Sequence, residues 1–307
     1  MKKTAFLFPG QGSQAVGMGK SFFDQSEEAR NIFKTADEVL GYSLSKLSFE
    51  GPEEELKMTQ NTQPALLTVS TIAYRLLGHT PAVAAGHSLG EYSALVAAGA
   101  LRFEDAVLIV HKRGKYMQEA VPVGIGAMAA VIGLGYEAIE AAIAQVKSGV
   151  VQIANWNAAD QIVISGHKQA VEEALRIAKP PRSVMLPVSA PFHSPLMKSA
   201  EERLAVDLDA VAFADLRFPI VNNVDAKMIR TGAEARDGLK RQVSRPVMWT
   251  KSMEALSGEA IDAFVEVGAG KVLVGLIKRI GRGWAHPFTM LNVEDVESLA
   301  KTKAGLE

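Results

Sequence analysis

Short apolar runs alternate along the chain with longer segments in which apolar residues recur at helical spacing. One run, residues 5–8, ends at Pro9-Gly10, and a second, residues 82–86, follows Pro81; both are typical of buried strands bounded by turns. Helical spacing is found at 20–40, 62–78, 89–98 and 103–120. Short buried strands that alternate with helices predict an α/β fold with a mostly parallel sheet flanked by helices.

The pattern changes near Pro122. The segments that follow predict, in order, a strand, a helix, a hairpin, a helix and a strand: 128–132, 136–146, 150–154 with 161–165, 169–178 and 183–188. This is the ferredoxin-like order of elements. We therefore predict a large α/β catalytic domain formed by 1–123 and 191–307, with a small ferredoxin-like α+β domain inserted at 124–190. The charged tail after Glu294 is expected at the periphery.

Composition narrows the class of protein. The 307 residues are 48% hydrophobic and 22% charged, which is the balance of a globular protein with a sizeable core. The net charge of -1 provides no global field for nucleic acid or an anionic membrane. The absence of cysteine excludes disulfides, thiolate metal sites and a cysteine nucleophile. The first apolar run is too short for a secretory signal and no run reaches the ~20 residues of a membrane span, so we expect a cytoplasmic protein.

The segment Gly86-His87-Ser88-Leu89-Gly90 matches the pattern G-x-S-x-G. A predicted strand ends before Ser88 and a predicted helix begins after it, which is the context of a nucleophile elbow. Glycines suit this strained turn because a side chain would crowd the neighbouring elements, and the helix N-terminus offers free N–H groups. The alternative is a glycine-flanked serine in an ordinary βα turn. The strand–turn–helix context favours the elbow.

A serine nucleophile needs a base. The histidines of the chain are His79, His87, His111, His167, His193 and His286. His193 lies within 189–195, where two prolines restrain the loop and the chain returns to the large domain. We expect the side chain of His87 to point away from its neighbour, and His79 and His111 to be structural or solvated. For His193 itself, the alternative to a base is a histidine packed in a rigid loop.

The reaction also needs donors for an oxyanion. The N–H of Leu89, directly after the nucleophile, is the usual first donor. The loop 9–14 follows the first predicted strand, and its glycines allow the backbone to approach a ligand closely. Phosphate binding is the competing use of such a loop, but the segment lacks the Lys-Ser/Thr ending of a P-loop and the G-x-G-x-x-G spacing.

Five motifs occur together in one order along the chain. They are Gly10-Gln11-Gly12-Ser13-Gln14, Gly86-His87-Ser88-Leu89-Gly90-Glu91, Arg113-Gly114, Pro191-Phe192-His193-Ser194, and Gln242 upstream of Pro246-Val247-x-Trp249. With this series the chain resembles the malonyl-CoA:acyl carrier protein transacylases from residue 4 to about residue 280. The resemblance implies a hydrolase-like α/β core with a ferredoxin-like insert. It also implies an acyl-carrier-protein S-malonyltransferase that supplies fatty acid or polyketide synthesis.

The resemblance implies that Ser88 is the nucleophile and His193 its base. It also implies that the backbone N–H groups of Gln11 and Leu89 bind the oxyanion. Arg113 would bind the malonyl carboxylate, and Gln242 would orient the base through its backbone carbonyl. An arginine can grip a carboxylate through two parallel hydrogen bonds. Without the resemblance, the better explanation of Arg113 would be a solvated side chain on an amphipathic helix. Phe192 resembles the bulky residue with which malonyl-selective members exclude an α-methyl group, and a core aromatic is its alternative. Pro181 stands where many relatives carry a second basic residue for carrier docking.

The expected partners are malonyl-CoA and an acyl carrier protein, and we expect a monomer without nucleic-acid or membrane partners. No cofactor or metal is expected, because malonyl-CoA is a substrate and the phosphopantetheine belongs to the carrier. A serine thioesterase or esterase would share Ser88 and His193, but Arg113 fits malonyl transfer better than an apolar acyl pocket. A non-catalytic carrier-binding subunit is a further alternative that would have no need of these three residues.

Overall fold

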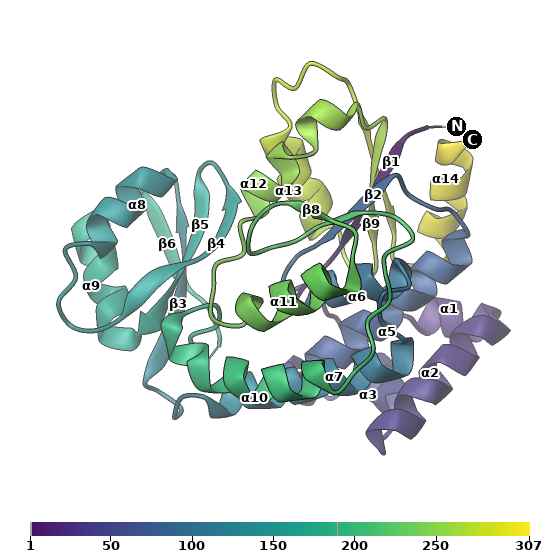
Figure 1. Ribbon diagram of the computed structural model, residues 1–307, viewed down its shortest axis with the longest axis horizontal. Coiled ribbons are helices and arrows are strands. Elements are labelled where there is room, and N and C mark those ends of the chain that lie inside the picture. The colour runs from purple at the N-terminus through teal and green to yellow at the C-terminus, as the bar shows by residue number, and fades with distance from the viewer. Residues whose placement is uncertain (1, 189) are drawn as a thin grey trace.

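The computed structural model describes residues 2–188 and 190–307, and this part of the chain folds around two sheets (Figure 1). The larger sheet has six strands in the order β10-β9-β1-β2-β7-β8. All neighbours in it are parallel except the β7–β8 pair, so the predicted α/β class is confirmed. The strands are β1 (Thr4–Phe8), β2 (Val83–Gly86), β7 (Ile220–Val221), β8 (Met228–Ile229), β9 (Ala263–Val267) and β10 (Thr289–Val293).

Both faces of the large sheet are covered by helices. Phe6 and Phe8 of β1 join one hydrophobic cluster, and Ala5 and Leu7 join another, because successive side chains of a strand point to opposite faces. The first cluster includes side chains of α5 (Thr59–Leu77), α6 (Leu89–Ala97) and α7 (Phe103–Glu119). The second includes side chains of α12 (Trp249–Glu254) and α13 (Val272–Ile280). The run at 5–8 lacks polar alternation because neither face is exposed.

The smaller sheet is antiparallel, with the order β4-β5-β3-β6, and lies beside the large one (Figure 1). The chain order of its elements is the predicted ferredoxin-like one: β3 (Gly126–Ile132), α8 (Tyr136–Ile143), β4 (Val151–Ala158), β5 (Gln161–His167), α9 (Lys168–Ala178) and β6 (Arg182–Met185). Apolar side chains of α8 and α9 pack on one face of this sheet. The division into domains at 124 and 190 stays a prediction.

Some element boundaries differ from those predicted. The first strand of the predicted hairpin, 150–154, extends further than expected, because β4 continues to Ala158, which still pairs with Gln161. The predicted strand 183–188 ends at Met185, and the segment after it turns toward the cavity described below. The predicted helix 20–40 is broken at Ser26, whose side chain accepts a hydrogen bond from the N–H of Ala29 and so caps the second helix.

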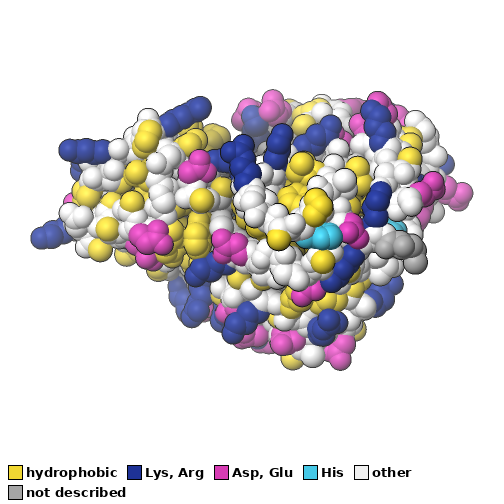
Figure 2. Space-filling model, turned by 90° about the horizontal axis from the view of Figure 1, so that it is seen from above, with side chains coloured by type: hydrophobic (Ala, Val, Ile, Leu, Met, Phe, Trp, Pro, Cys, Tyr) yellow, Lys and Arg dark blue, Asp and Glu magenta, His cyan; other side chains and the backbone are white. Residues whose placement is uncertain are grey.

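The remaining helices lie at the periphery of the large sheet (Figure 1). They are α1 (Lys20–Gln25), α2 (Glu27–Leu40), α3 (Leu44–Glu50), α4 (Glu53–Lys57), α10 (Lys198–Asp209), α11 (Gly232–Gln242) and α14 (Val296–Leu306), with short 3-10 turns at Pro195–Met197 and Ser257–Glu259. The charged tail is thus peripheral but helical, and Leu306 anchors it to the core. Among the described residues, no helix is long and apolar enough to span a bilayer. Lys and Arg side chains are interspersed with Asp and Glu across the face shown in Figure 2.

Gly90 allows α6 to lie directly against β1. A Cβ at this position would be 2.0 Å from the backbone oxygen of Phe8. We expect Gly90→Ala to lower the free energy of unfolding by about 1–3 kcal/mol or more, because the backbone cannot move aside. Gly275→Ala in α13 is the matched control, since nothing lies within 4 Å of its added Cβ, and it should be stabilising by up to about 1 kcal/mol. Urea denaturation measures both, and equal effects would contradict this account of the packing.

Candidate active site

Ser88 lies in the turn between β2 and α6 with φ 51° and ψ −106°. This positive-φ conformation is strained for a residue with a side chain and is maintained only when the surroundings enforce it. The enforcement begins with close packing, because a Cβ at Gly86 would lie 1.9 Å from the backbone of Gly90. The turn therefore has the geometry of the predicted nucleophile elbow.

Asn223 holds this turn from both sides. Its Oδ1 accepts a hydrogen bond from the N–H of Ser88 at 2.7 Å, and its Nδ2 donates to the carbonyl of Gly86 at 2.6 Å. The side chain is fully buried. Asn223 was not predicted from the sequence, because it lies in a loop after β7, 135 residues beyond Ser88, and belongs to no motif.

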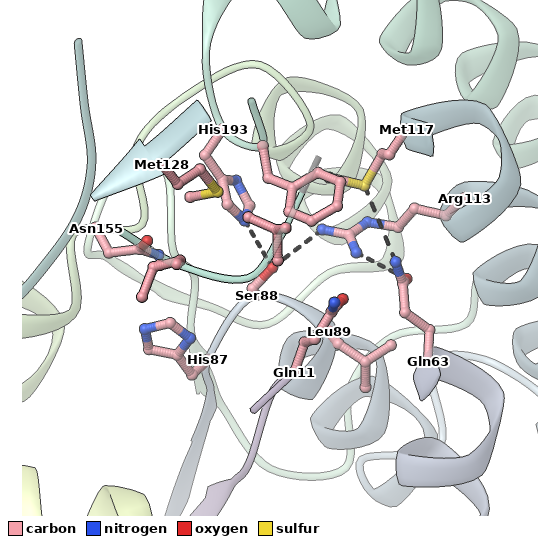
Figure 3. A pocket seen from close by; sticks show the side chains of 13 residues that line it. Gln11, Gln63, His87, Ser88, Leu89, Arg113, Met117, Met128, Asn155 and His193 are labelled. Atoms are coloured by element: carbon pink, nitrogen blue, oxygen red, sulfur yellow. Dashed lines mark hydrogen bonds between the residues drawn. The ribbon is translucent and has the colours of Figure 1, made fainter. Parts of the chain in front are cut away.

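His193 lies against Ser88 although 105 residues separate them along the chain (Figure 3). The distance from Ser88 Oγ to His193 Nε2 is 2.7 Å. On the other side of the ring, Nδ1 is 2.9 Å from the backbone carbonyl of Gln242. Because a carbonyl can only accept, Nδ1 carries the proton and Nε2 is left to accept the proton of the serine. Ser189, at the start of the predicted loop, lies outside the described residues.

The electrostatics of the site favour neutral imidazole. Burial, followed by the nearby charge of Arg113, lowers the pKa of His193 to about 3. Both effects disfavour the charged form of the ring. The histidine is therefore in its proton-accepting form across the physiological range, as a general base requires.

Arg113 comes from α7 and is only 2% exposed, so the alternative of a solvated arginine is wrong. Its guanidinium donates to Gln63 Oε1 at 2.8 Å, to Gln242 Oε1 at 2.9 Å and to Ser88 Oγ at 3.1 Å. All three acceptors are neutral. Gly114 allows this approach, because a Cβ there would be 2.6 Å from the backbone of Gln60 at the start of α5.

These side chains face one cavity of about 130 Å³ (Figure 3). Polar groups occupy one part of its wall, and apolar side chains from both sheets' elements form the rest, namely Met117, Met128, Leu186, Val188 and Phe192. Phe192 thus lines the site and is not merely a core aromatic. His87 also lines the cavity, but its Nε2 is bonded to Asn157 Oδ1 at 2.8 Å, not to Ser88.

The loop after β1 closes the cavity beside the elbow. A Cβ at Gly10 would be 2.4 Å from the carbonyl of His87, so the two turns are in direct contact. Gln11 lines the cavity from this loop, and its side chain donates to Thr59 Oγ1 at 3.3 Å. Leu89 also lines the cavity, at the first position of α6, where a backbone N–H has no partner within the helix.

Two further residues of this site were not assigned from the sequence. Gln63 was missed because nothing in the helical pattern of α5 distinguishes it from a core position, and it is fully buried. Glu91 was visible as the last letter of the serine motif, but its contacts depend on segments far away. The described residues contain no group of three or more His, Asp or Glu side chains placed to hold a metal ion.

Comparison with known proteins agrees with this geometry. The sequence profile of the family described as "Acyl transferase domain" matches residues 5–301. The malonyl CoA-acyl carrier protein transacylase of Bacillus subtilis is 49% identical over 290 residues, which cover 92% of each chain. The protein of the same name from Escherichia coli K12 is 49% identical over 288 residues, covering 91% of this chain and 93% of that one.

Solved structures agree equally well. The malonyl CoA-acyl carrier protein transacylase of Coxiella burnetii superposes with a TM-score of 0.95 at 42% identity, covering 99% of this chain and 97% of that one. A malonyl-transacylase in complex with a type II PKS acyl-carrier protein has a TM-score of 0.94 at 42% identity, covering 99% of both chains. Fold and profile together define an acyltransferase. Within that class, the chain belongs to the malonyl-CoA:acyl carrier protein transacylase family.

The protonation state of His193 is directly measurable. Because burial and the Arg113 charge lower its pKa to about 3, its imidazole resonances should not titrate between pH 5 and 8. Arg113→Gln removes the neighbouring charge and should raise the pKa of His193. NMR titration of protein with labelled histidine tests both statements. A His193 resonance in the unsubstituted protein with a midpoint inside that range would contradict the first, and an unchanged pKa in the variant the second.

Proposed function

We propose that the protein moves a malonyl group from coenzyme A to the phosphopantetheine thiol of an acyl carrier protein, through a malonyl ester on Ser88. One observation carries this proposal: Ser88 Oγ lies within hydrogen-bond distance of both His193 Nε2 and the Arg113 guanidinium, in a single small cavity. The names of the relatives, which describe transfer between malonyl-CoA and acyl carrier protein, support the same reaction.

In the first half of the reaction, Ser88 Oγ attacks the thioester carbon while its proton passes to His193 Nε2. The tetrahedral intermediate collapses by breaking the C–S bond, and the leaving thiolate takes the proton from the imidazolium. Coenzyme A departs as a thiol, and the malonyl group stays as a serine ester. Gln242 orients the base through its backbone carbonyl.

The second half reverses these steps with another thiol. The phosphopantetheine thiol of the carrier gives its proton to His193 and attacks the ester carbon. Ser88 Oγ then leaves and recovers the proton from the imidazolium. Dividing one transfer into two displacements lets two bulky thiols use the same site in turn.

We assign the stabilisation of both oxyanions to the backbone N–H groups of Gln11 and Leu89. The first lies on the loop after β1 and the second at the start of α6, and both residues border the cavity beside Ser88. Fixed N–H dipoles aimed at the developing charge are often the largest contribution to acyl-transfer catalysis.

Arg113 is the proposed receptor for the malonyl carboxylate. It lies 3.1 Å from the nucleophile, so the carboxylate it binds must be only a few bonds from the reacting carbonyl, as in malonyl. Its hydrogen-bond acceptors are neutral. When a substrate carboxylate binds, the guanidinium would exchange these bonds for charge-assisted hydrogen bonds to the carboxylate. We assign to Phe192, in the cavity wall, the exclusion of a methyl group on the carbon between the two carbonyls.

A serine hydrolase would use the same nucleophile and base, but it has no use for a buried guanidinium beside them. The names of the relatives do not favour it, nor a non-catalytic subunit. Incubation with malonyl-CoA distinguishes the functions, because a hydrolase releases malonate whether or not carrier protein is present. We further propose that the enzyme acts as a monomer in the cytoplasm and needs no bound cofactor.

The first functional prediction concerns the acyl-enzyme. Ser88→Ala should form no malonyl adduct in intact-mass spectra after brief exposure to malonyl-CoA. His193→Ala should slow acylation by about 10²–10⁴-fold, because the hydroxyl loses its general base. His286→Ala is the matched control, since this partly exposed histidine pairs with Asp262 away from the cavity, and it should acylate normally. A His193→Ala enzyme with near-normal acylation would refute the assigned base.

The second concerns Arg113. Arg113→Ala should reduce kcat/KM for malonyl-CoA by the equivalent of about 3–5 kcal/mol, because a buried carboxylate would lose its partner. Acetyl-CoA has no carboxylate, so its transfer should hold or rise. Arg113→Lys keeps the charge without the planar fork, so its kcat/KM for malonyl-CoA should lie between the values of the unsubstituted enzyme and of Arg113→Ala. If Arg113→Ala reduced kcat/KM equally for malonyl-CoA and acetyl-CoA, the guanidinium would not be the carboxylate receptor.

A further inference from the structure

Glu91 is a fully buried carboxylate directly behind the nucleophile, three residues after Ser88 in the first turn of α6. Its Oε2 accepts hydrogen bonds from Gln242 Nε2 at 2.8 Å and from the N–H of Asn223 at 3.0 Å. Its Oε1 is buried and has no hydrogen-bond partner among residues 2–188 and 190–307. The reaction described above does not use this group, and a buried carboxylate without a compensating function is costly.

Arg113 is a buried positive charge near this buried carboxylate. None of the ion pairs among the described residues involves it, and the acceptors of its hydrogen bonds are all neutral. The amide of Gln242 lies between the two charges: Oε1 accepts from Arg113 and Nε2 donates to Glu91. The guanidinium and the carboxylate are thus connected through one polarised amide, without touching.

We propose that Glu91 is a positioning residue that supplies the buried counter-charge of Arg113 through the side-chain amide of Gln242. The inference rests on the proposed malonyl transfer and deepens it. A direct ion pair between the two would occupy the guanidinium and compete with the substrate carboxylate. The relay through Gln242 offsets the positive charge and leaves the guanidinium free to exchange its neutral partners for substrate.

The same carboxylate also supports the nucleophile. By accepting from the N–H of Asn223, Glu91 anchors the backbone of the residue whose side chain holds the N–H of Ser88. Gln242 Nε2 additionally donates to the carbonyl of Ser88 at 3.1 Å. The position of Arg113 and the strained turn of Ser88 therefore depend on one buried anion.

Removal of this charge has a defined kinetic signature. Without Glu91, Arg113 would bind a carboxylate at least as strongly, so the half-saturating concentration of malonyl-CoA should not rise. The loss of the negative charge behind Gln242 would, however, disfavour formation of the imidazolium of His193 in the transition state, so the maximal acylation rate should fall. A residue that merely maintained the fold would instead weaken substrate binding or the stability of the protein.

The effect should also depend on pH. Burial raises the pKa of Glu91 to about 7, against the opposing influence of its hydrogen bonds and of Arg113. Among the described residues, the charged groups that act on it are Arg113 on α7 and Asp225 in the loop after β7, and Glu91 acts in turn on Tyr92 of α6. Burial raises the pKa of Tyr92, and an ion pair with Arg241 lowers that of Asp225 to about 2. His193 is neutral well below pH 7. Acylation should therefore decline as pH falls through about 7, where Glu91 gains a proton.

The test measures single-turnover acylation by malonyl-CoA and by acetyl-CoA from pH 5.5 to 8.5. Glu91→Gln preserves the shape and one acceptor oxygen but removes the charge. We expect its maximal acylation rate at pH 8 to be about tenfold lower with both substrates. The half-saturating concentration of malonyl-CoA should stay the same or fall, and the decline near pH 7 should disappear.

The pH profile of the unsubstituted enzyme is a second measurement, and it does not depend on the folding of a variant. Protonation removes the same charge from Glu91 as the substitution does. The maximal acylation rate should therefore fall through about pH 7 with acetyl-CoA as well as with malonyl-CoA, while the half-saturating concentration of malonyl-CoA should not rise.

Glu266→Gln is the matched control. This carboxylate is also fully buried, burial raises its pKa to about 7, and its Oε2 accepts from the N–H of Val274 at the start of α13, outside the active-site cavity. Its loss should leave the pH profile of acylation unchanged. A similar change in Glu266→Gln and Glu91→Gln would overturn the proposal, because any buried carboxylate would then have the same effect.

Other outcomes would overturn it as well. If Glu91→Gln kept both the rate and the decline near pH 7, or raised the half-saturating concentration of malonyl-CoA without slowing the reaction, Glu91 would not be the counter-charge. If Glu91→Gln did not fold, an acylation rate of the unsubstituted enzyme that stayed constant through pH 7 with both substrates would overturn the proposal by itself. Failure of the unsubstituted enzyme to form a malonyl adduct would be a different result, which refutes the proposed function itself.

Discussion

A positive charge buried among neutral acceptors is the constraint on which this site depends. Arg113 is 2% exposed, and its guanidinium donates to two glutamine amides and the hydroxyl of Ser88. Burial of a charge without a direct counter-ion is unfavourable, so the site has unused binding capacity for an anion of suitable size. Low dielectric also strengthens attraction at short range. Desolvation makes the buried arginine energetically costly. Because it also strengthens the attraction of the guanidinium for an anion, it allows the site to select a carboxylate.

The architecture meets this constraint by bringing separate segments to one point. The nucleophile is held by close contact of α6 with β1, and the base comes from the loop that returns from the small sheet. Apolar wall residues come from both sides, with Met117 on α7 and Met128 on β3. An isolated parallel β-bridge between Asn155 and Val247 also connects β4 to the segment before α12. One face of the small sheet, with Met128, Ala154 and Val163, joins the larger core beside the cavity, and its other face packs against α8 and α9.

Much of the fold could be predicted because its signals are local. The apolar runs at 5–8 and 82–86 are β1 and β2, and the ferredoxin-like order after Pro122 is confirmed. Glycine permits, and proline restricts, backbone conformation wherever they occur, so the glycines beside Ser88 and the prolines near His193 are local signals. Less could be predicted after residue 190, where strands such as β7 and β8 have two residues each and are too short to produce a periodic pattern. Gln63, Asn223 and the role of Glu91 in the site were missed for a related reason: a polar residue carries no local mark of its distant partner.

The sequence by itself therefore determined the class of fold, the order of the elements between residues 124 and 188, and the residue types available for chemistry. Only the tertiary structure decided which of them meet. It buried Arg113, which helical spacing alone would place in solvent, and connected it through Gln242 to Glu91. The physical reason is that periodicity and turn chemistry act over a few residues, whereas burial and hydrogen-bond partners of a side chain depend on how whole elements pack.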